Sequence, residues 1–590
     1  MKRNWLLTTV VIFLVIAGLT VRLGYLMLHK SETYAEMAED VWQRERSIKA
    51  ARGQIYDRNG VVLATNESVC TVSVIHNQIT DPETVIQVLS ETLHLTEEAV
   101  RKRVEKRSSI ERIKANVDKE TGDYLKSQKL DGVVVDEDYR RVYPIGTIAS
   151  RVIGFTGADN QGILGLEVAY EDVLGGTNGT ILTTTTAHGL TIDGAAEARV
   201  EPIAGLDLYT SLDYNIQLYC QQAAESCLAA TGAKTVSIVV MNPQNGEILA
   251  MTTLPEFDAN TPYAPVESLL FTLDEEGVRH PYAWETLTED EKTNFLNAMW
   301  RNPLISDTYE PGSTFKIVTS TAAFEAGVLK VSDRFYCPGH YVVEDRIIHC
   351  HKRAGHGSED FRQGIMNSCN PVFMQIAERT GAEQTYVTYK KLGLFQKTGV
   401  DLPGEANSIM HKLENIGAVE LATMSFGQSF QITPLQLLTA ASCVVNGGTR
   451  ITPHLGVSVM NPETGEITEL SYPTEENCVS EETSALMREL LHDVVAEGTG
   501  KRAYLAGYTI GGKTATSQKL PRSSHKYIAS FLGFAPAEDP QIMALVLIDE
   551  PVGVYYGGTI AAPVVQEVFA NVLPYLGIPM TEETAEETEN

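Results

Sequence analysis

Positively charged residues are scarce in this sequence of 590 residues. Lysine and arginine together number 47 against 76 aspartate and glutamate residues, so the net charge is −29. The phosphates of nucleic acids and acidic lipid surfaces repel such a chain, and we expect no nucleic-acid partner. The sequence also contains no repeat of fixed period, no heptad run, no phosphate-cradling glycine loop and no metalloprotease helix motif. These absences argue against coiled-coil, nucleotide-binding and metalloprotease functions.

Long hydrophobic runs are absent except at the N-terminus. Lys2 and Arg3 precede an apolar stretch from 5 to 28 that only Arg22 interrupts. A stretch of this length can cross the hydrocarbon core as one helix, with Arg22 reaching toward the interface. The positive residues on the short side predict a cytoplasmic N-terminus. A cleaved secretory signal is the alternative, although no clear small-x-small cleavage site follows the run.

Cysteines are few, and their wide spacing excludes a disulfide-framework protein. Most should be buried as small apolar residues. Cys337 and Cys350 differ from the other cysteines because several histidines lie close to them in the sequence, between 340 and 356. Three states are open for this segment: a disulfide between Cys337 and Cys350, a zinc site whose spacing matches no standard finger, or free thiols with surface imidazoles. We name the disulfide as the prediction and assign no metal ligand.

The length exceeds what one hydrophobic core usually organises, so several domains are expected. We predict a cytoplasmic tip and transmembrane anchor at 1–30, a non-catalytic pedestal at 31–233, a catalytic domain at 234–576 and a disordered acidic tail at 577–590. Residues 31–50 are expected to continue the membrane helix outward.

The pedestal is predicted to be an elongated α/β module. Residues 52–60 indicate a strand that enters an Asn-Gly turn, and the patterns at 82–93 and 96–106 indicate helices. Glycine and short strand patterns dominate from 134 to 210.

The second domain opens with a helix at 212–230 and closes with a helix at 559–573. Strand patterns come from both ends of this segment, while 300–447 is mostly helical. The expected strands are 235–241, 248–253, 508–517, 527–535 and 541–549. An α+β fold follows, in which helices cover a five-stranded antiparallel sheet.

The first candidate motif places Ser313 at the start of a helix, after Pro311-Gly312. Lys316 lies one turn further along the same face, so its amine can reach the Ser313 hydroxyl. A lysine accepts a proton only if burial or neighbouring charge keeps it neutral. Alone this motif is weak, because a serine cap followed by a solvated lysine is common.

The second motif, Ser368-Cys369-Asn370, falls on a short turn between two predicted helices. The Ser368 hydroxyl could relay a proton from Lys316, and the Asn370 amide could hold a substrate carbonyl. A helix cap and an ordinary turn residue are the alternative interpretation.

The third motif is Lys513-Thr514-Ala515-Thr516 on a predicted strand. Strand alternation places Lys513 and Ala515 on one face and the two threonines on the other. A cation and hydroxyls along a sheet edge suit a carboxylate and a backbone-paired peptide. The alternative is an exposed strand with a surface lysine.

Together, and in this order, the three motifs resemble those of penicillin-binding proteins and serine β-lactamases. Residues 300–312 are similar to division and sporulation transpeptidases of Gram-positive bacteria, and the resemblance covers residues 1 to about 575. Further segments similar to class B penicillin-binding proteins are 52–60, Tyr143-Pro144, Gly165-Leu166-Glu167, Met241-Asn242-Pro243 with Gly246-Glu247, and Ser425-Phe426-Gly427-Gln428.

The resemblance implies a peptidoglycan D,D-transpeptidase. Ser313 would attack the carbonyl between the two terminal D-alanines of a stem peptide, and Lys316 would take its proton. Ser368 would pass that proton to the leaving amine. An amine from a neighbouring strand would then resolve the acyl-enzyme, whereas penicillin would acylate Ser313 without efficient release. Neither a metal nor an organic cofactor is required.

For the substrate, the resemblance implies that Lys513, Thr514 and Thr516 bind the terminal carboxylate. The backbone N–H groups of Ser313 and Thr516 would form the oxyanion hole. Ala515 departs from the glycine that the family usually has at this place, and its methyl group could narrow the cleft or alter the fit of β-lactams.

Other expectations concern location and partners. The resemblance implies a single-pass protein of the bacterial cytoplasmic membrane with its catalytic domain outside. Expected partners are stem peptides ending in D-Ala-D-Ala, β-lactams, a membrane glycosyltransferase of the shape, elongation, division and sporulation type, and other septal proteins. Rival functions are a D,D-carboxypeptidase or β-lactamase of the same superfamily, and a catalytically silent septal scaffold or β-lactam sensor for which Ala515 is the only support.

Overall fold

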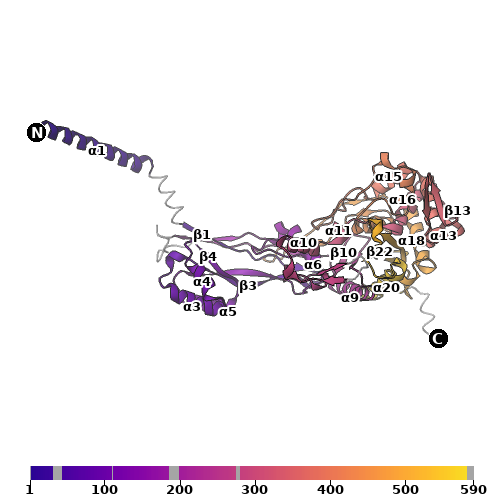
Figure 1. The fold of residues 1–590 in the computed structure, drawn as a ribbon, viewed down its shortest axis with the longest axis horizontal. Helices are drawn as coiled ribbons and strands as arrows, with labels where there is room; N and C mark the ends of the chain where they lie inside the picture. The colour runs from indigo at the N-terminus through magenta and orange to yellow at the C-terminus, as the bar shows by residue number, and fades with distance from the viewer. Residues whose placement is uncertain (1, 31–42, 109, 185–197, 274–278, 581–590) are drawn as a thin grey trace. The chain divides into compact units, whose positions relative to one another are not determined.

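The structure is a computed structural model in which residues 2–30, 43–108, 110–184, 198–273 and 279–580 are described (Figure 1). The chain forms two compact units that both contain helices and strands, which confirms the predicted α+β class. Unit 1 comprises Met1–Arg52, Asn66–Arg140 and Gly175–Gly205, and unit 2 comprises Gly53–Thr65, Arg141–Leu174 and Leu206–Asn590. The predicted boundary at 233 therefore stays a proposal, and the predicted tail lies largely outside the described residues.

The N-terminal helix α1 spans Lys2–His29. Its segment Val10–Met27 has a mean hydropathy of 2.2 and is long and apolar enough to cross a membrane. The prediction that this helix extends to residue 50 is wrong at its end, because Gln43–Ile48 form strand β1. This strand pairs antiparallel with β6, Gly179–Thr184, so its backbone finds partners in another strand. The intervening residues 31–42 lie outside the described part of the chain.

Unit 1 packs three helices against strands. Helices α3 (Pro82–Leu93) and α4 (Glu97–Val104) confirm two predictions, and the side chains of Asp81 and Thr96 cap them by accepting backbone hydrogen bonds. The remaining elements of its core are α5 (Lys119–Ser127), β4 (Glu111–Asp118), β5 (Val133–Val142) and the C-terminal part of β3 (Val62–Val74), which pairs with both β4 and β5.

Unit 2 begins with the predicted turn. Strand β2, Ile55–Tyr56, leads into a turn in which Gly60 has φ +83°. The Asp57 carboxylate closes this turn by accepting hydrogen bonds from the backbone N–H groups of Asn59 and Val61. β2 also pairs in parallel with β8, Asp207–Thr210.

Between 150 and 174, short helices replace the short strands that were predicted, whereas the strands β6, β7 (Ala198–Val200) and β8 follow further along as predicted. Glu167 lies in α7 (Gly165–Ala169), where its buried carboxylate meets the buried Arg141 guanidinium at 2.7 Å. A buried ion pair is stable only when its charged atoms lie close together. The helical turn of α7 places the Glu167 carboxylate at such a distance from Arg141. The other two helices are α6 (Ser150–Ile153) and α8 (Glu171–Leu174).

The central sheet of unit 2 has five antiparallel strands in the order β10-β9-β23-β22-β21. Its strands arise from both ends of the segment, as predicted. Their bounds are β9 Thr235–Met241, β10 Ile248–Leu254, β21 Gly511–Gln518, β22 Tyr527–Ala535 and β23 Ile542–Asp549. The edge strand β21 is the one that carries Lys513.

Alternating residues of this sheet supply two hydrophobic cores. Ile238 and Val240 pack with helices α9 (Tyr214–Thr231) and α20 (Ala562–Tyr575), while Val239 belongs to the core of the helical segment. The helices of that segment are α10 (Glu289–Trp300), α11 (Pro303–Ser306), α12 (Lys316–Glu325), α13 (Phe361–Met366), α14 (Asn370–Thr380), α15 (Ala382–Lys391), α16 (Ala418–Met424), α17 (Pro434–Val445) and α18 (Glu481–Ala496).

One part of the segment predicted as mostly helical is built of strands. β-branched residues flank a turn at Glu344, and they favour extended backbone. Strands β14 (His340–Val343) and β15 (Arg346–His349) form a hairpin, which is enclosed between the paired strands β13 (Arg334–Cys337) and β16 (Gly357–Asp360). This small β insertion leads directly into α13 and the second motif.

Candidate active site

Ser313 lies in a 3-10 turn, Gly312–Phe315, that runs straight into α12. Gly312 has φ +60°, and a Cβ atom there would lie 2.5 Å from Ser517 Oγ on β21. Its backbone N–H donates to Gly427 O at 2.9 Å. Glycine suits this position because it adopts a positive φ and has no Cβ atom to clash with Ser517. The close approach places the half-buried Ser313 beside the end of β21.

Lys316 opens helix α12 and is fully buried. Its Nζ atom donates to Ser368 O at 2.7 Å, to Ser368 Oγ at 3.2 Å and to Asn370 Oδ1 at 2.8 Å. The same Nζ atom also lies 5.1 Å from the centre of the Phe373 ring. Two of the three motifs are therefore in direct contact.

Lys513 brings the third motif into the same cluster. It is fully buried, and its Nζ atom donates to Ser368 Oγ at 2.9 Å and to Thr514 O at 3.2 Å. The Ser368 hydroxyl thus lies between two lysine amines. We call Lys316, Ser368, Asn370 and Lys513 the lysine cluster.

Burial lowers the pKa of both lysines in this cluster. The pKa of Lys316 falls to about 7, mainly because a charged amine loses its hydration there. The pKa of Lys513 falls well below its ordinary value for the same reason, and the positive charge of Lys316 lowers it further. Near neutral pH an unprotonated amine is therefore accessible beside the Ser368 hydroxyl, as general base chemistry requires.

Ser368 occupies the turn between α13 and α14 in a left-handed conformation, with φ +52°. Such backbone is uncommon for serine and persists where surrounding contacts fix it. Cys369 follows as the cap residue of α14, and Asn370 is the first residue of that helix. The predicted turn position is therefore observed.

The threonines of the third motif point away from the lysine. The Thr514 hydroxyl donates to Thr499 Oγ1 at 3.2 Å, and Thr516 Oγ1 accepts from the Gly557 backbone N–H at 3.1 Å. Ala515 is only 3% exposed and lies on the lysine face, where its Cβ faces the Gly312 turn. The alternation predicted for this strand is thus seen.

Residues 236–570 match the penicillin-binding protein transpeptidase domain, and residues 47–210 match the penicillin-binding protein dimerisation domain. Stage V sporulation protein D of Bacillus subtilis is 38% identical over 582 residues, which cover 97% of this chain and 85% of that protein.

The chain is a class B penicillin-binding protein. Its transpeptidase domain makes it a serine-type peptidoglycan D,D-transpeptidase. A probable peptidoglycan D,D-transpeptidase, PenA of Neisseria meningitidis, is 28% identical over 574 residues, which cover 96% of this chain and 91% of that protein.

Solved structures share the fold of this class B penicillin-binding protein. Penicillin-binding protein 2X from Streptococcus thermophilus aligns with a TM-score of 0.72 at 21% identity, covering 90% of this chain and 80% of that one. Penicillin-binding protein 3 from Mycobacterium tuberculosis, complexed with aztreonam, aligns with a TM-score of 0.67 at 24% identity, covering 91% and 99%.

The disulfide predicted for this class B penicillin-binding protein is not formed. All eight cysteines are free and buried, including Cys337 and Cys350. Instead Cys337, Cys350, His356 and Cys369 place their sulfur and nitrogen atoms within 4.8 Å of one another. We call these four residues the cysteine cluster. The sequence-based prediction assigned no metal ligand, yet thiolates and an imidazole are the donors that zinc prefers.

Sequence reasoning missed Cys369 as a cluster member, and it missed Thr499 and Gly557 as contacts of the third motif. The position of Cys369 inside the second motif was a usable signal, since it places a thiol beside the site. Thr499 lies in an unremarkable Gly-Thr-Gly stretch, and Gly557 contributes only its backbone. Neither carries a sequence signal.

Proposed function

We propose that this protein cross-links peptidoglycan by D,D-transpeptidation with Ser313 as the acyl-forming nucleophile. The observation that carries the assignment is the contact of both lysines, Lys316 and Lys513, with the single hydroxyl of Ser368. Such a chain of groups can move a proton from the nucleophile to the leaving amine. It involves all three motifs, one of which begins with Ser313.

Acylation begins when Ser313 Oγ attacks the carbonyl carbon between the two terminal D-alanines. Lys316, neutral because of its burial, accepts the hydroxyl proton. The backbone N–H groups of Ser313 and Thr516 would stabilise the oxyanion. As the C–N bond breaks, Ser368 delivers the proton to the departing D-alanine, and an ester to Ser313 remains.

Cross-linking completes the reaction. An amine from a second stem peptide attacks the ester carbonyl, forms the new amide and returns the proton to the Ser313 oxygen through Lys316. Lys513, Thr514 and Thr516 would bind the terminal carboxylate, and Asn370 a backbone carbonyl of the substrate. A β-lactam would follow the first half of this path and stay attached.

The arrangement in the cell is also part of the proposal. Helix α1 would anchor the protein in the bacterial cytoplasmic membrane, with Lys2 and Arg3 on the cytoplasmic side and the chain beyond the helix outside. The chain would comprise an anchor at 1–30, a pedestal at 31–233, a transpeptidase domain at 234–576 and a tail at 577–590. A membrane glycosyltransferase of the shape, elongation, division and sporulation type would supply glycan strands.

Labelling with a fluorescent penicillin tests the nucleophile. The full-length protein in detergent should form one covalent fluorescent band, and mass spectrometry should place the adduct on the peptide containing Ser313. Ser313→Ala should abolish the band, whereas the exposed Ser332→Ala should retain it. Labelling of Ser313→Ala at the wild-type level would overturn the assignment.

Turnover separates the transpeptidase from its rivals. The fluorescent adduct should persist over many minutes, and a stem pentapeptide with an acceptor amine should yield a cross-linked product. Rapid release of hydrolysed penicillin would identify a β-lactamase, and D-alanine release without cross-linking would identify a carboxypeptidase. A folded wild type that is never labelled would identify a silent scaffold.

A further inference from the structure

The cysteine cluster is assembled from four separate points of the β insertion and its neighbouring helix. Cys337 ends β13, Cys350 follows β15, His356 precedes β16, and Cys369 caps α14. The three cysteines are each at most 1% exposed. Residues so far apart along the chain are brought together by strand pairing and tight turns.

Two glycine turns hold this arrangement. A Cβ atom on Gly339 would lie 2.0 Å from Arg353 O, and one on Gly355 would lie 2.3 Å from Cys337 O. Both glycines have positive φ, so no other residue would fit without strain. The loops that carry Cys337, Cys350 and His356 are therefore packed backbone against backbone.

The spacing of the donor atoms suits a tetrahedral zinc ion. Zinc lies about 2.3 Å from thiolate sulfur and about 2.0 Å from imidazole nitrogen, which sets neighbouring ligand atoms roughly 3.5 to 3.8 Å apart. Cys350 Sγ lies 3.6 Å from His356 Nδ1. All four ligand atoms lie within 4.8 Å of one another, so small side-chain adjustments complete the tetrahedron.

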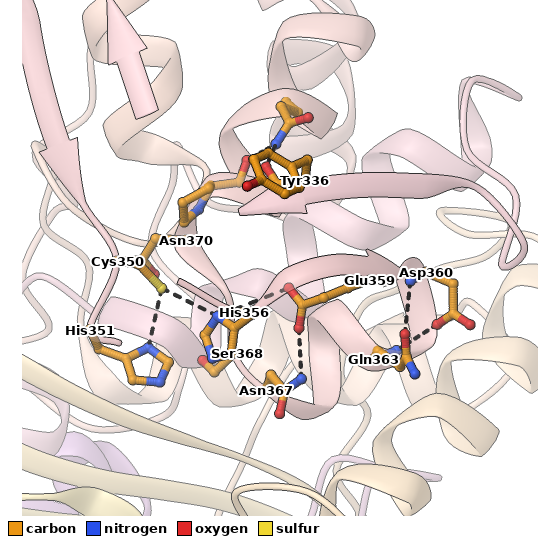
Figure 2. A network of polar contacts seen from close by, with 12 residues as sticks. Tyr336, Cys350, His351, His356, Glu359, Asp360, Gln363, Asn367, Ser368 and Asn370 are labelled. Atoms are coloured by element: carbon orange, nitrogen blue, oxygen red, sulfur yellow. Dashed lines mark hydrogen bonds and ion pairs between the residues drawn. The ribbon is translucent and has the colours of Figure 1, made fainter. Parts of the chain in front are cut away.

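A second observation points to the same ligand. Glu359 is 3% exposed, and its Oε2 atom accepts no hydrogen bond from any residue that the structure describes. That atom lies 4.0 Å from His356 Nδ1, while Oε1 accepts from the Asn367 amide at 2.6 Å (Figure 2). Because the Oε2 atom faces the same ring nitrogen as Cys350 Sγ, a cation bound beside them would compensate the buried carboxylate of Glu359.

A disulfide accounts for less of this arrangement. One bridge would join two of the three sulfur atoms. It would not explain why the third thiol, His356 and Glu359 lie beside them. Three thiolates and one imidazole, by contrast, form a closed structural zinc site with no position left for water. Figure 2 shows Cys350 facing both His351 and His356. His351 is exposed, and its Nδ1 atom lies 3.8 Å from Cys350 Sγ.

We infer that Cys337, Cys350, His356 and Cys369 bind one zinc ion, and that this ion fixes the turn presenting Ser368 and Asn370 to the lysine cluster. The second part rests on the proposed function. Binding releases the thiol protons to solvent and forms three sulfur–zinc bonds and one nitrogen–zinc bond. Because Cys369 lies between Ser368 and Asn370, its bond to zinc holds the left-handed backbone of Ser368 in place.

Metal analysis of the full-length protein in detergent, purified without chelators, tests the site directly. Inductively coupled plasma mass spectrometry should find about one zinc per chain. Cys350→Ser and His356→Ala should lose it, whereas His351→Ala and the buried Cys227→Ser on α9 should retain it. Equal zinc in Cys350→Ser and wild type would overturn the inference.

Cobalt supplies a measurement on the wild type in case a variant fails to fold. After zinc removal and addition of Co²⁺ alone, the protein should show thiolate-to-cobalt charge-transfer absorption and tetrahedral ligand-field bands. Octahedral cobalt without thiolate absorption would contradict the inference. A Cys337–Cys350 disulfide in unreduced peptides, or three freely alkylated thiols in protein that contains no zinc, would also contradict it.

The role at the active site has its own readout. Removing zinc should slow labelling by fluorescent penicillin at least tenfold, and adding Zn²⁺ back should restore it. Ser313→Ala should keep its zinc while losing all labelling, so failure of the proposed function is distinguishable from failure of the zinc site. Unchanged labelling after complete zinc removal would show that the ion does not fix the turn that carries Ser368 and Asn370. That result would overturn the second part of the inference.

Discussion

The lysine cluster and the cysteine cluster lie on either side of one turn, yet different interactions hold them. Hydrogen bonds of 2.7 to 3.2 Å join the members of the lysine cluster. In the cysteine cluster the sulfur-to-imidazole distance is 3.6 Å, and Glu359 Oε2 accepts no hydrogen bond from a described residue. Protein groups alone thus fix the first, whereas the second has the spacing of ligands around an ion.

Chemistry and structural support are thus divided between the two clusters. The lysine cluster contains the groups that can exchange protons, and the cysteine cluster contains groups that bind metal and shape the backbone. They meet at residues 368–370, where alternate side chains belong to different clusters.

The largest effect is expected from Lys316→Met, which keeps the length of the side chain but removes its amine. Without the base, the rate constant for penicillin acylation should fall by about 10² to 10⁴-fold. Zinc content should be unchanged, which separates the two clusters. The exposed Lys330→Met is the control and should acylate normally. Wild-type acylation by Lys316→Met would show that another group takes the proton.

A smaller effect is expected from Glu359→Gln, which removes the negative charge beside His356. An oxygen acceptor for Asn367 remains, so the fold should be kept. Zinc affinity, measured by competition with a chelator, should fall by about 10 to 100-fold. The exposed Glu383→Gln should bind zinc like the wild type. Equal affinities for the two variants would remove Glu359 from the site.

The pH dependence of acylation tests the lysine cluster without a mutation. Burial lowers the pKa of Lys316 to about 7, and only the neutral amine can accept the Ser313 proton. Acylation should therefore fall about tenfold for each pH unit below 7 and level off above it. Stopped-flow rates with a fluorescent penicillin would locate the break. A rate that stays constant through neutral pH would contradict a lysine base.

Local patterns predicted the elements of the catalytic domain well. The five strands of the sheet are apolar and bounded by turn residues, and the three motifs are short enough to be recognised without knowledge of the fold. The relay from Lys316 to Ser368 was expected from the motifs and their family resemblance, whereas the hydrogen bonds that both lysines donate to Ser368 Oγ depend on tertiary packing, which local patterns do not carry.

The sequence-based predictions that were wrong share a physical cause. Residues 43–48 form a strand because β6 pairs with them, and that partner lies far along the chain. The disulfide prediction considered only Cys337 and Cys350, since Cys369 was interpreted solely as a residue within the second motif. In both cases the structure brings together residues that are distant in sequence, and local spacing carries no information about such neighbours.

The smallest effect is expected from Ala515→Gly, which restores the glycine usual in this family. The methyl group is 3% exposed and faces the Gly312 turn, so it is buried inside the protein. Its loss, with the added freedom of the unfolded chain, should cost about 0.5 to 1 kcal/mol of unfolding free energy. The matched buried Ala529→Gly on β22 should cost a similar amount. Because the methyl group is buried and faces the Gly312 turn, its removal should change the rate of acylation by bulky cephalosporins less than about threefold, which is under 1 kcal/mol. A gain beyond tenfold for Ala515→Gly alone would mean that the methyl group does narrow the groove, and that the strand side of the lysine cluster sets drug fit.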